Sequence, residues 1–295
     1  MRLHIGGKDD YSIAELCRIL GVSRQGYHKH IKTLDKPYKH ASLLAEIKAI
    51  RTEDEFNDTY GRPRLLDALK LRGWIISDST LYRILVKNNL LSKTGKPKGL
   101  TRQDREAYKG DDLLKKDFNG HEPDKKFIGD ITQLPTADGT LYIALTFDCF
   151  DNACVGLAMD DNMKSSLVER SLQMAVSRKT VADAIFHSDR GSQYTSDGFR
   201  NLIKKHNLKQ SMSYATFSCY GNAKCESLIG RFKVEAIYKR YNTKNMSMTA
   251  VKALVFRYFM GYWNNRRINH AIGGMPPMEK RRRYYERLAV RDLAA

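Results

Sequence analysis

The chain has 295 residues, enough for two or three domains that each bury a core, and a formal net charge of +18, which favours a polyanionic partner. No run of about 18 apolar residues occurs and the first residues lack the apolar core of a signal peptide, so we expect no membrane span and a cytoplasmic, nucleoid-associated protein. Five cysteines without a Cys-x-x-Cys pair indicate neither a disulfide framework nor a zinc knuckle.

The positive charge is concentrated in the last part of the chain. From Arg231 onward, 15 Lys and Arg residues stand against four Asp and Glu, a balance of +11. A short basic run is usually a solvated helix face, but so lopsided a balance is typical of proteins that bind nucleic acid.

Near the N-terminus, two helix starts flank a glycine. Ser12 and Glu15 have the spacing of a capping box, and Gly21 permits a turn before Ser23, which can cap a second helix. This pattern predicts a helix-turn-helix in residues 1–40, with a plain helical hairpin as the alternative. The predicted DNA contacts of its second helix are Arg24, Gln25, Tyr27 and His28.

Residues 41–91 show helical apolar periodicity and predict a second module that again resembles a helix-turn-helix. In this module Pro63 suits the first turn of a helix, and Asp78 or Ser79 offers the cap of the next. Residues 92–126 lack apolar periodicity and predict a basic, loop-like or weakly helical linker.

Residues 127–240 alternate strands with helices. Apolar runs at 128–134, 141–147 and 153–158 are separated by good hairpin turns and predict three antiparallel strands. Helix, strand, helix, strand and helix follow, which is the order of an α/β ribonuclease-H-like core with a mixed five-stranded sheet. Residues 241–295 predict a basic helical C-terminal region with a packed apolar stripe from Val251 to Tyr262.

Three acidic residues fall at the ends of these predicted elements. Asp130 and Asp189 close strands, and Glu226 opens a helix. Phosphodiester chemistry needs charge neutralised on the attacking and leaving oxygens, which two magnesium ions about 3.5 to 4 Å apart can do through hard oxygen ligands. We therefore predict these three acids as catalytic and metal-binding residues, whereas each alone would be an ordinary turn or cap residue.

Two further residues lie close to these acids in sequence. Lys233 lies seven residues after Glu226, on nearly the same helical face, and is predicted to hold a DNA phosphate; the alternative is an exposed lysine. His187 lies two residues before Asp189 and therefore on the same face of the predicted strand. We expect it to be a supporting or core residue rather than a metal ligand.

Several segments resemble bacterial insertion-sequence transposases with a retroviral-integrase-like core, closest to the second-reading-frame product of the group that transposes through excised circles. The three signature segments are Phe127-Ile128-Gly129-Asp130-Ile131-Thr132, His187-Ser188-Asp189-Arg190-Gly191-Ser192-Gln193-Tyr194 and Asn222-Ala223-Lys224-Cys225-Glu226-Ser227. Tyr60-Gly61-Arg62-Pro63-Arg64 and Trp263-Asn264-Asn265-Arg266-Arg267 extend the resemblance over nearly the whole chain.

The resemblance implies an Asp-Asp-Glu triad at Asp130, Asp189 and Glu226, dependence on Mg²⁺ with Mn²⁺ as a substitute, and strand transfer by a DNA 3′ hydroxyl. It also implies DNA partners, namely the terminal inverted repeats of a mobile element and target DNA, and homo-oligomers that bridge two ends. A helix-turn-helix protein from an upstream reading frame is a further candidate partner. Additional DNA contacts are expected at Arg62, Arg64, Asn222, Lys233, Arg266 and Arg267.

The sequence departs from that group at two points. Phe127 stands where a tryptophan is usual, and the 36 residues between Asp189 and Glu226 are one more than usual, an insertion that the loop at 214–222 can absorb. Two other functions remain open: a metal-dependent nuclease that cuts without strand transfer, and a DNA-binding regulator whose core is silent. The presence of all three acids argues against the regulator.

Overall fold

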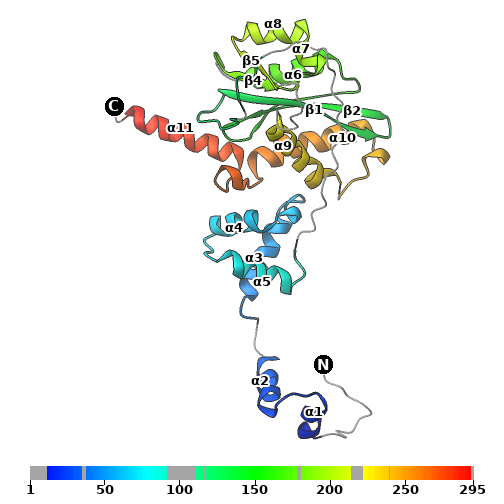
Figure 1. The fold of residues 1–295 in the computed structure, drawn as a ribbon, viewed down its shortest axis with the longest axis vertical. Helices are drawn as coiled ribbons and strands as arrows, with labels where there is room; N and C mark the ends of the chain where they lie inside the picture. Colours follow the sequence, from blue (N-terminus) through cyan, green and yellow to red (C-terminus); the bar gives the residue numbers. More distant parts are fainter. Residues whose placement is uncertain are drawn as a thin grey trace. The chain divides into compact units, whose positions relative to one another are not determined.

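The computed structural model describes residues 12–34, 38–91, 111–115, 117–177, 181–213, 222–238 and 240–293. By its internal contacts the chain divides into two compact units, Met1–Lys48 and Ala49–Ala295 (Figure 1). None of the described helices is both long enough and apolar enough to cross a membrane.

The first unit contains two short helices before the start of α3 (Ala41–Thr52). These are α1 (Ile13–Ile19) and α2 (Arg24–Leu34). The predicted capping box is present, because the Glu15 amide donates to Ser12 Oγ and the Ser12 amide donates to Glu15 Oε2. Gly21 has φ +64°, a left-handed conformation that favours glycine, and the Gly26 amide donates to Ser23 Oγ at 3.0 Å. The capped helix, glycine turn and capped helix are therefore confirmed.

The second unit begins within the last turns of α3. The short η1 turn (Asn57–Thr59), α4 (Arg62–Leu71) and α5 (Asp78–Lys87) follow in that order. Pro63 lies in the first turn of α4, as predicted. The cap of α5 is Ser77, whose Oγ accepts from the Thr80 amide, so the predicted cap at Asp78 or Ser79 is wrong because both already have helical backbone. Residues 92–110 and 116 of the predicted linker lie outside the described residues.

A mixed five-stranded sheet forms the centre of the second unit. Its strands are β1 (Lys126–Thr136), β2 (Gly139–Asp148), β3 (Cys154–Asp160), β4 (Ile185–Ser188) and β5 (Lys209–Met212). Their order across the sheet is β3-β2-β1-β4-β5; the first three are antiparallel, and β4 and β5 run parallel to β1. This arrangement confirms the predicted ribonuclease-H-like fold preceded by helical segments.

Helices cover both faces of this sheet (Figure 1). On one face lie α6 (Ser165–Val176), α7 (Ser192–Thr195) and α8 (Asp197–Lys205). On the other lie α9 (Ala223–Phe232), the wide turn η2 (Lys233–Ile237), α10 (Met248–Phe256) and η4 (Arg257–Trp263), followed by η5 (His270–Ile272) and α11 (Pro277–Leu293); η3 (Thr243–Asn245) precedes α10. The predicted apolar stripe is confirmed as packing, because all of its residues are buried: Val251, Leu254, Val255, Tyr258, Phe259 and Tyr262.

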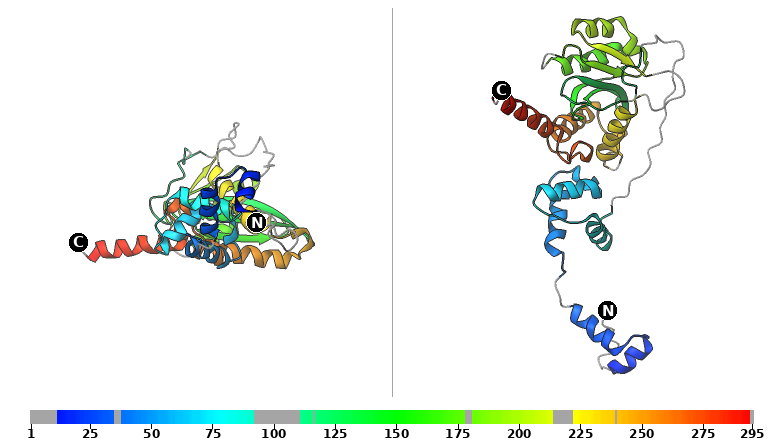
Figure 2. Two further views of the ribbon diagram at one scale, coloured as in Figure 1. Left: turned by 90° about the horizontal axis from the view of Figure 1, so that it is seen from below. Right: turned by 60° about the vertical axis from the view of Figure 1, so that its left-hand side comes forward.

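The C-terminal helix α11 is anchored at its start by one buried arginine. Arg281 donates to Asp148 at 2.6 Å, to Asp151 at 2.7 Å and to Asp124 at 3.0 Å. The later turns of α11 extend away from the sheet, and Val290 is 67% exposed (Figure 2). The anchor therefore holds the first turns of the helix and leaves the rest accessible.

A buried carboxylate, Glu235 in η2, joins three separate parts of the second unit. Its oxygens accept two hydrogen bonds from Arg267, one from Arg64 Nη1 at 2.9 Å and one from the Tyr258 hydroxyl at 2.8 Å. Burial alone would raise the pKa of Glu235, but the charge and hydrogen bonds of Arg267, the charge of Arg64 and the hydrogen bond from Tyr258 lower it to about 2. The ionised form of Glu235 is therefore a strong contributor to the native state.

We expect Glu235→Gln to lower the free energy of unfolding by about 3 to 5 kcal/mol, because it leaves two buried arginine charges uncompensated. The measurement is urea denaturation at pH 7, with Glu286→Gln as the matched control. Glu286 pairs with Arg282 on an exposed helix face, where such a pair contributes about 0 to 1 kcal/mol.

The stability difference between the parent and Glu235→Gln should depend on pH. The pKa of Glu235 is lowered from 4.5 to about 2, so its stabilisation is fully present above pH 4.5 and is lost as the pH falls towards 2. The stability difference between parent and Glu235→Gln should narrow over that window. A difference that is under 1 kcal/mol at neutral pH, or unchanged by acid, would contradict this assignment.

Candidate active site

Two of the three predicted acids lie close together near the end of the pairing between two parallel strands. Ile128 of β1 is paired with His187 of β4, the last pair of this ladder. Asp189 directly follows β4, as predicted, whereas Asp130 lies inside β1 and not at its end, because β1 continues to Thr136 in its pairing with β2. The charge of Asp189 acts on Asp130. Parallel strands are about 4.7 to 4.9 Å apart. The sheet therefore brings together two carboxylates that are far apart in the sequence.

The third acid reaches the same place from α9. This helix packs against β1, and Glu226 lies in its first turn. The prediction that Glu226 is the first residue of the helix is wrong, because the helix already begins at Ala223. The backbone carbonyl of Asn222 accepts from the Glu226 amide at 3.1 Å, and the Asn222 side chain donates to the Gly129 carbonyl at 3.0 Å. These contacts join the start of α9 to the residue before Asp130.

The electrostatics show that the three carboxylates interact. Burial, and then the charges of Asp189 and Glu226, raise the pKa of Asp130 to about 7. Burial also raises the pKa of Asp189, and burial together with Asp189 raises that of Glu226. Burial lowers the pKa of Lys233, while its attraction to Asp130 opposes that shift. The site is thus a cluster of repelling acids with one nearby ammonium group.

Backbone amides orient two of these carboxylates. Oδ1 of Asp130 accepts from the Ile131 amide at 2.8 Å, and Oδ1 of Asp189 accepts from the Gly191 amide at 3.0 Å. Gly129 is required beside them, since a Cβ there would lie 2.5 Å from the Phe186 ring. The close approach of β1 to β4 at this point therefore depends on a residue without a side chain.

Two buried side chains support the strand that leads to Asp189. His187 is fully buried, and its Nδ1 forms a 2.8 Å hydrogen bond with Ser211 Oγ on β5. Tyr194 is buried and close enough to Asp130 and Asp189 for their charges to raise the pKa of its phenol, after burial, which is the larger cause. Tyr194 was not singled out as a site residue, although it belongs to one of the signature segments.

The donor set fits a hard divalent cation, because it consists of carboxylate oxygens whose mutual repulsion a cation would relieve. Among the described residues, no three His, Cys, Asp or Glu side chains form a ready metal cage. Magnesium commonly binds through one or two carboxylates and completes its shell with water and phosphate oxygens. An open cluster of this kind is consistent with that mode of binding.

The predicted DNA contacts of the first unit lie on α2. Arg24, Gln25 and His28 are exposed there, and Tyr27 is half-buried. In the second unit, Arg62 and Arg266 are exposed but paired, with Asp78 and Asp54 respectively.

Three other predicted DNA contacts lie inside the fold. The Arg267 side chain is 1% exposed, and its Nε and Nη2 both donate hydrogen bonds to the Glu235 carboxylate. The prediction of a DNA contact at Arg267 is therefore wrong. Arg64 is largely buried and bound to the same carboxylate, so it is corrected for the same reason. Asn222 is 4% exposed and bonded to Gly129, which gives it a role within the site. The sequence displays each charge but not its partner.

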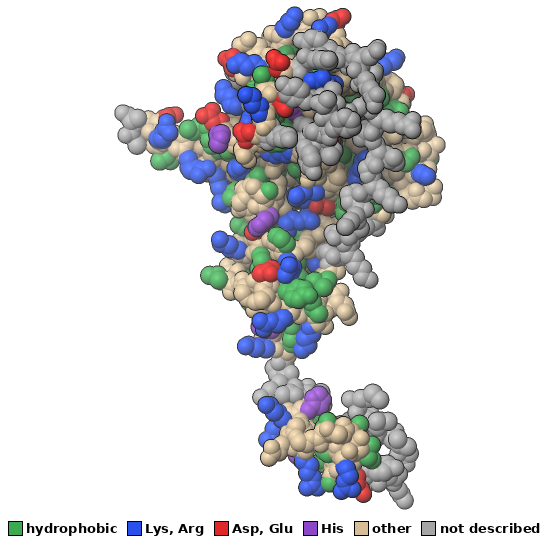
Figure 3. All heavy atoms as spheres, in the orientation of Figure 1, with side chains coloured by type: hydrophobic (Ala, Val, Ile, Leu, Met, Phe, Trp, Pro, Cys, Tyr) green, Lys and Arg blue, Asp and Glu red, His purple; other side chains and the backbone are tan. Residues whose placement is uncertain are grey.

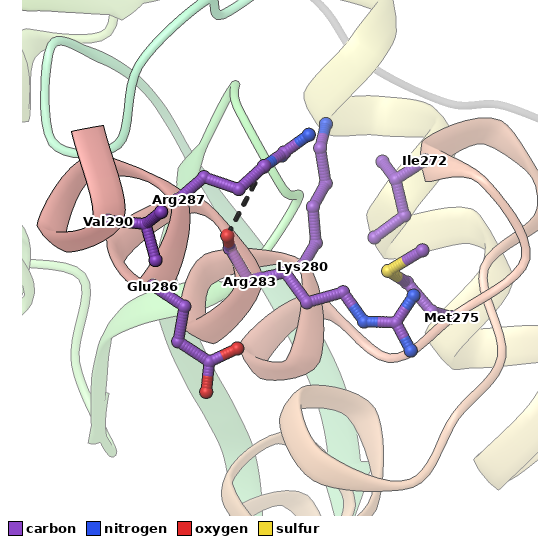
Figure 4. A pocket seen from close by; sticks show the side chains of 7 residues that line it. All are labelled: Ile272, Met275, Lys280, Arg283, Glu286, Arg287 and Val290. Atoms are coloured by element: carbon purple, nitrogen blue, oxygen red, sulfur yellow. Dashed lines mark hydrogen bonds between the residues drawn. The ribbon is translucent and has the colours of Figure 1, made fainter. Parts of the chain in front are cut away.

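Lys and Arg side chains are spread over the face shown in Figure 3. One surface hollow in the second unit lies between α11 and the η5 turn, and none of the three acids lines it (Figure 4). Lys280, Arg283 and Arg287 approach it from α11, and Ile272 and Met275 form its apolar side. The hollow is lined by three basic side chains and one acid, Glu286, and is separate from the carboxylate cluster.

Several known proteins are similar to this chain. Residues 120–216 match the model of the integrase core domain. The transposase InsF for insertion sequence IS3A of Escherichia coli K12 is 32% identical over 276 residues, which are 91% of this chain and 93% of the relative; InsF for IS3 of Escherichia coli O111:H- gives the same values. A chain of the simian T-cell lymphotropic virus intasome in complex with the PP2A regulatory subunit B56 gamma is 14% identical, with a TM-score of 0.46 and coverage of 75% of this chain and 74% of that one.

The identity to InsF extends over nearly the whole of both chains, and the integrase core match falls on the sheet that carries Asp130 and Asp189. This chain belongs to the family of bacterial insertion-sequence transposases with an integrase-like core, which are polynucleotidyl transferases of the DDE type.

Proposed function

We propose that Asp130, Asp189 and Glu226 form the catalytic triad of a transposase that cuts DNA at the ends of a mobile element and joins those ends to a target. The observation that carries the proposal is the meeting of three mutually repelling carboxylates of a ribonuclease-H-like fold, one within β1, one directly after β4 and one in the first turn of α9.

In the joining step, the oxygen of a DNA 3′ hydroxyl forms a bond to a target phosphorus atom while the bond from that phosphorus to its own 3′ oxygen breaks. The leaving oxygen takes up a proton as the attacking hydroxyl loses one, so the number of phosphodiester bonds is unchanged. Initial cleavage follows the same course with water as the attacking group. No covalent bond to the protein is needed, and the triad acts by position and charge.

Asp130, Asp189 and Glu226 are the residues that would hold magnesium, or manganese in its place, and two such ions would stabilise charge on the attacking and leaving oxygens. The raised pKa of Asp130 supports this role, since burial and then the charges of Asp189 and Glu226 disfavour its ionised form, and a bound cation would favour that form. Lys233, whose ammonium is attracted to Asp130, would hold a neighbouring backbone phosphate as a point charge.

We further propose that α2 binds the terminal inverted repeats through Arg24, Gln25, Tyr27 and His28, and that copies of the chain assemble on DNA in the cytoplasm and nucleoid. The division of the chain into a helix-turn-helix at 1–40, a second module at 41–91, a linker at 92–126, a core at 127–240 and a C-terminal region at 241–295 remains part of this proposal. Contact with a protein from an upstream reading frame also remains a prediction.

The competing functions differ in their products. With labelled element-end DNA, target DNA and Mg²⁺, joined products support the transposase. Cut products alone support a nuclease with the same triad, and bound but unreacted DNA supports a silent regulator.

We expect Asp189→Asn and Glu226→Gln each to abolish cutting and joining while end-DNA affinity stays within a few-fold, because an amide keeps the shape but loses the charge. Single-turnover assays and gel-shift titrations measure the two properties. Asp197→Asn, which removes an exposed acid paired with Arg200, should retain activity. Joining by Asp189→Asn would remove that residue from the mechanism.

Lys233→Ala should weaken binding to all DNA sequences alike and reduce the slope of log affinity against log salt by about one, as expected for the loss of one phosphate contact. The matched control is Lys244→Ala, an exposed lysine in η3. If salt dependence equals that of the parent while the magnesium requirement rises, Lys233 adjusts the carboxylates and does not hold DNA.

Substitution of an exposed residue of α2 tests whether this helix recognises the base sequence of the element ends. Arg24→Ala in the full chain should reduce the preference for end DNA over random DNA by at least several-fold, since a good base contact contributes about 1 to 3 kcal/mol of discrimination. Arg18→Ala removes an exposed cation from α1 and serves as control. Equal loss of affinity for both DNAs with Arg24→Ala would restrict that residue to phosphate contact.

A further inference from the structure

Asn222 contacts the backbone beside two of the three acids. Its Nδ2 donates to the carbonyl of Gly129, the residue before Asp130, at 3.0 Å. Its own backbone carbonyl accepts from the Glu226 amide at 3.1 Å. Asn222 is 4% exposed, so solvent does not compete strongly for these bonds. One residue thus joins the strand that carries Asp130 to the helix that carries Glu226.

The Gly129 carbonyl lies just past the end of one strand pairing. The parallel pairing of β1 with β4 ends at Ile128 and His187, one residue before Gly129, while β2 remains paired with β1 and places Thr146 opposite Gly129. The Phe186 ring of β4 also closes in on Gly129 and leaves no room for a Cβ. A buried carbonyl without a partner costs about 1 to 3 kcal/mol, and the Asn222 amide removes that cost. The strand is therefore fixed from both sides immediately before Asp130.

The side-chain oxygen of Asn222, Oδ1, differs from Nδ2 in its hydrogen bonding. Its Oδ1 is buried, and no described residue donates a hydrogen bond to it. A buried acceptor of this kind is a candidate for a functional contact with a donor from outside the protein, such as a water molecule or a hydroxyl group of DNA. A purely structural asparagine would be expected to use both atoms, as Asn264 does with the backbone of Cys154.

We propose that Asn222 is a positioning residue that sets the spacing between Asp130 and Glu226 and so determines the affinity of the site for divalent metal. The proposal rests on the triad proposed above. Asn222 carries no charge and would not act on the phosphate itself; it keeps two acids that lie in different elements at a fixed separation. Loss of a partner that orients metal ligands typically lowers metal affinity about 10- to 100-fold.

The test substitutes Asn222→Ala in the full chain and compares it with Asn264→Ala. Asn264 is a matched control because it is also a buried asparagine that joins a helix to a strand, but its partner is Cys154 of β3. Three quantities are measured: the Mg²⁺ concentration at half-maximal joining, the Mg²⁺ concentration that half-completes the rise in unfolding temperature without DNA, and the affinity for end DNA.

For Asn222→Ala we expect both Mg²⁺ midpoints to rise about 10-fold or more and DNA affinity to change less than about three-fold. For Asn264→Ala we expect a lower unfolding temperature with both midpoints unchanged. Asn222→Ser, which leaves space for a water to bridge to Gly129, should shift the midpoints in the same direction by a smaller factor and serves if the alanine variant does not fold.

Midpoints for both Asn222 variants that equal those of the parent would overturn the inference, because Asn222 would then be a packing residue like Asn264. So would a fall in DNA affinity that accounts for all the lost joining. Failure of the triad itself is recognised separately: it appears as joining by Asp189→Asn, whatever the Asn222 variants do.

Discussion

The ionised carboxylate of Glu235 holds three separate segments of the second unit together. A buried charge is tolerated only when it is fully paired, and here the pairing comes from Arg64 of α4, Arg267 after η4 and Tyr258 within η4. These three segments can satisfy Glu235 only by meeting at η2. Because η2 continues directly from α9, the same ion cluster fixes the far end of the helix on which Glu226 lies.

The helix that carries Glu226 is consequently held at both of its ends. At the start, Asn222 joins it to β1, and after its last turn Glu235 joins it to α4 and η4. The backbone widens at Lys233–Ile237, where one extra residue enters the helical turn. Lys233 is electrostatically coupled to Asp130, whereas Glu235, two residues later, is bonded into the interior. Adjacent turns of one helical segment can therefore serve the site and the core.

Local features of the fold could be predicted from the sequence because their causes are local. A capping box at Ser12 and Glu15, a left-handed glycine at position 21 and the hairpin turns between the first strands each act within a few residues. The register that aligns Asp130 with Asp189 could be anticipated only from the order of elements, since nothing near either acid specifies its partner. The cap at Ser77 was misplaced by one or two residues and the start of α9 by three, as expected where several neighbouring polar residues compete for a helix end.

The number of basic residues was a poor guide to DNA contacts, because it does not distinguish those that face solvent from those that are neutralised inside the fold. An acidic stretch before α4 pairs Asp54 with Arg266, Glu55 with Arg257 and Asp58 with Arg240. Together with Arg267 on Glu235 and Arg281 on three aspartates, these pairs use part of the basic excess to hold the unit together. Glu235 was the signal for this, since it is an acid among arginines and aromatic residues and is buried with them, whereas Glu279 and Glu286 pair with arginines on an exposed helix face. A footprint for DNA must accordingly be sought where cations remain exposed, on α2 and along α11, and not in proportion to the net charge of each segment.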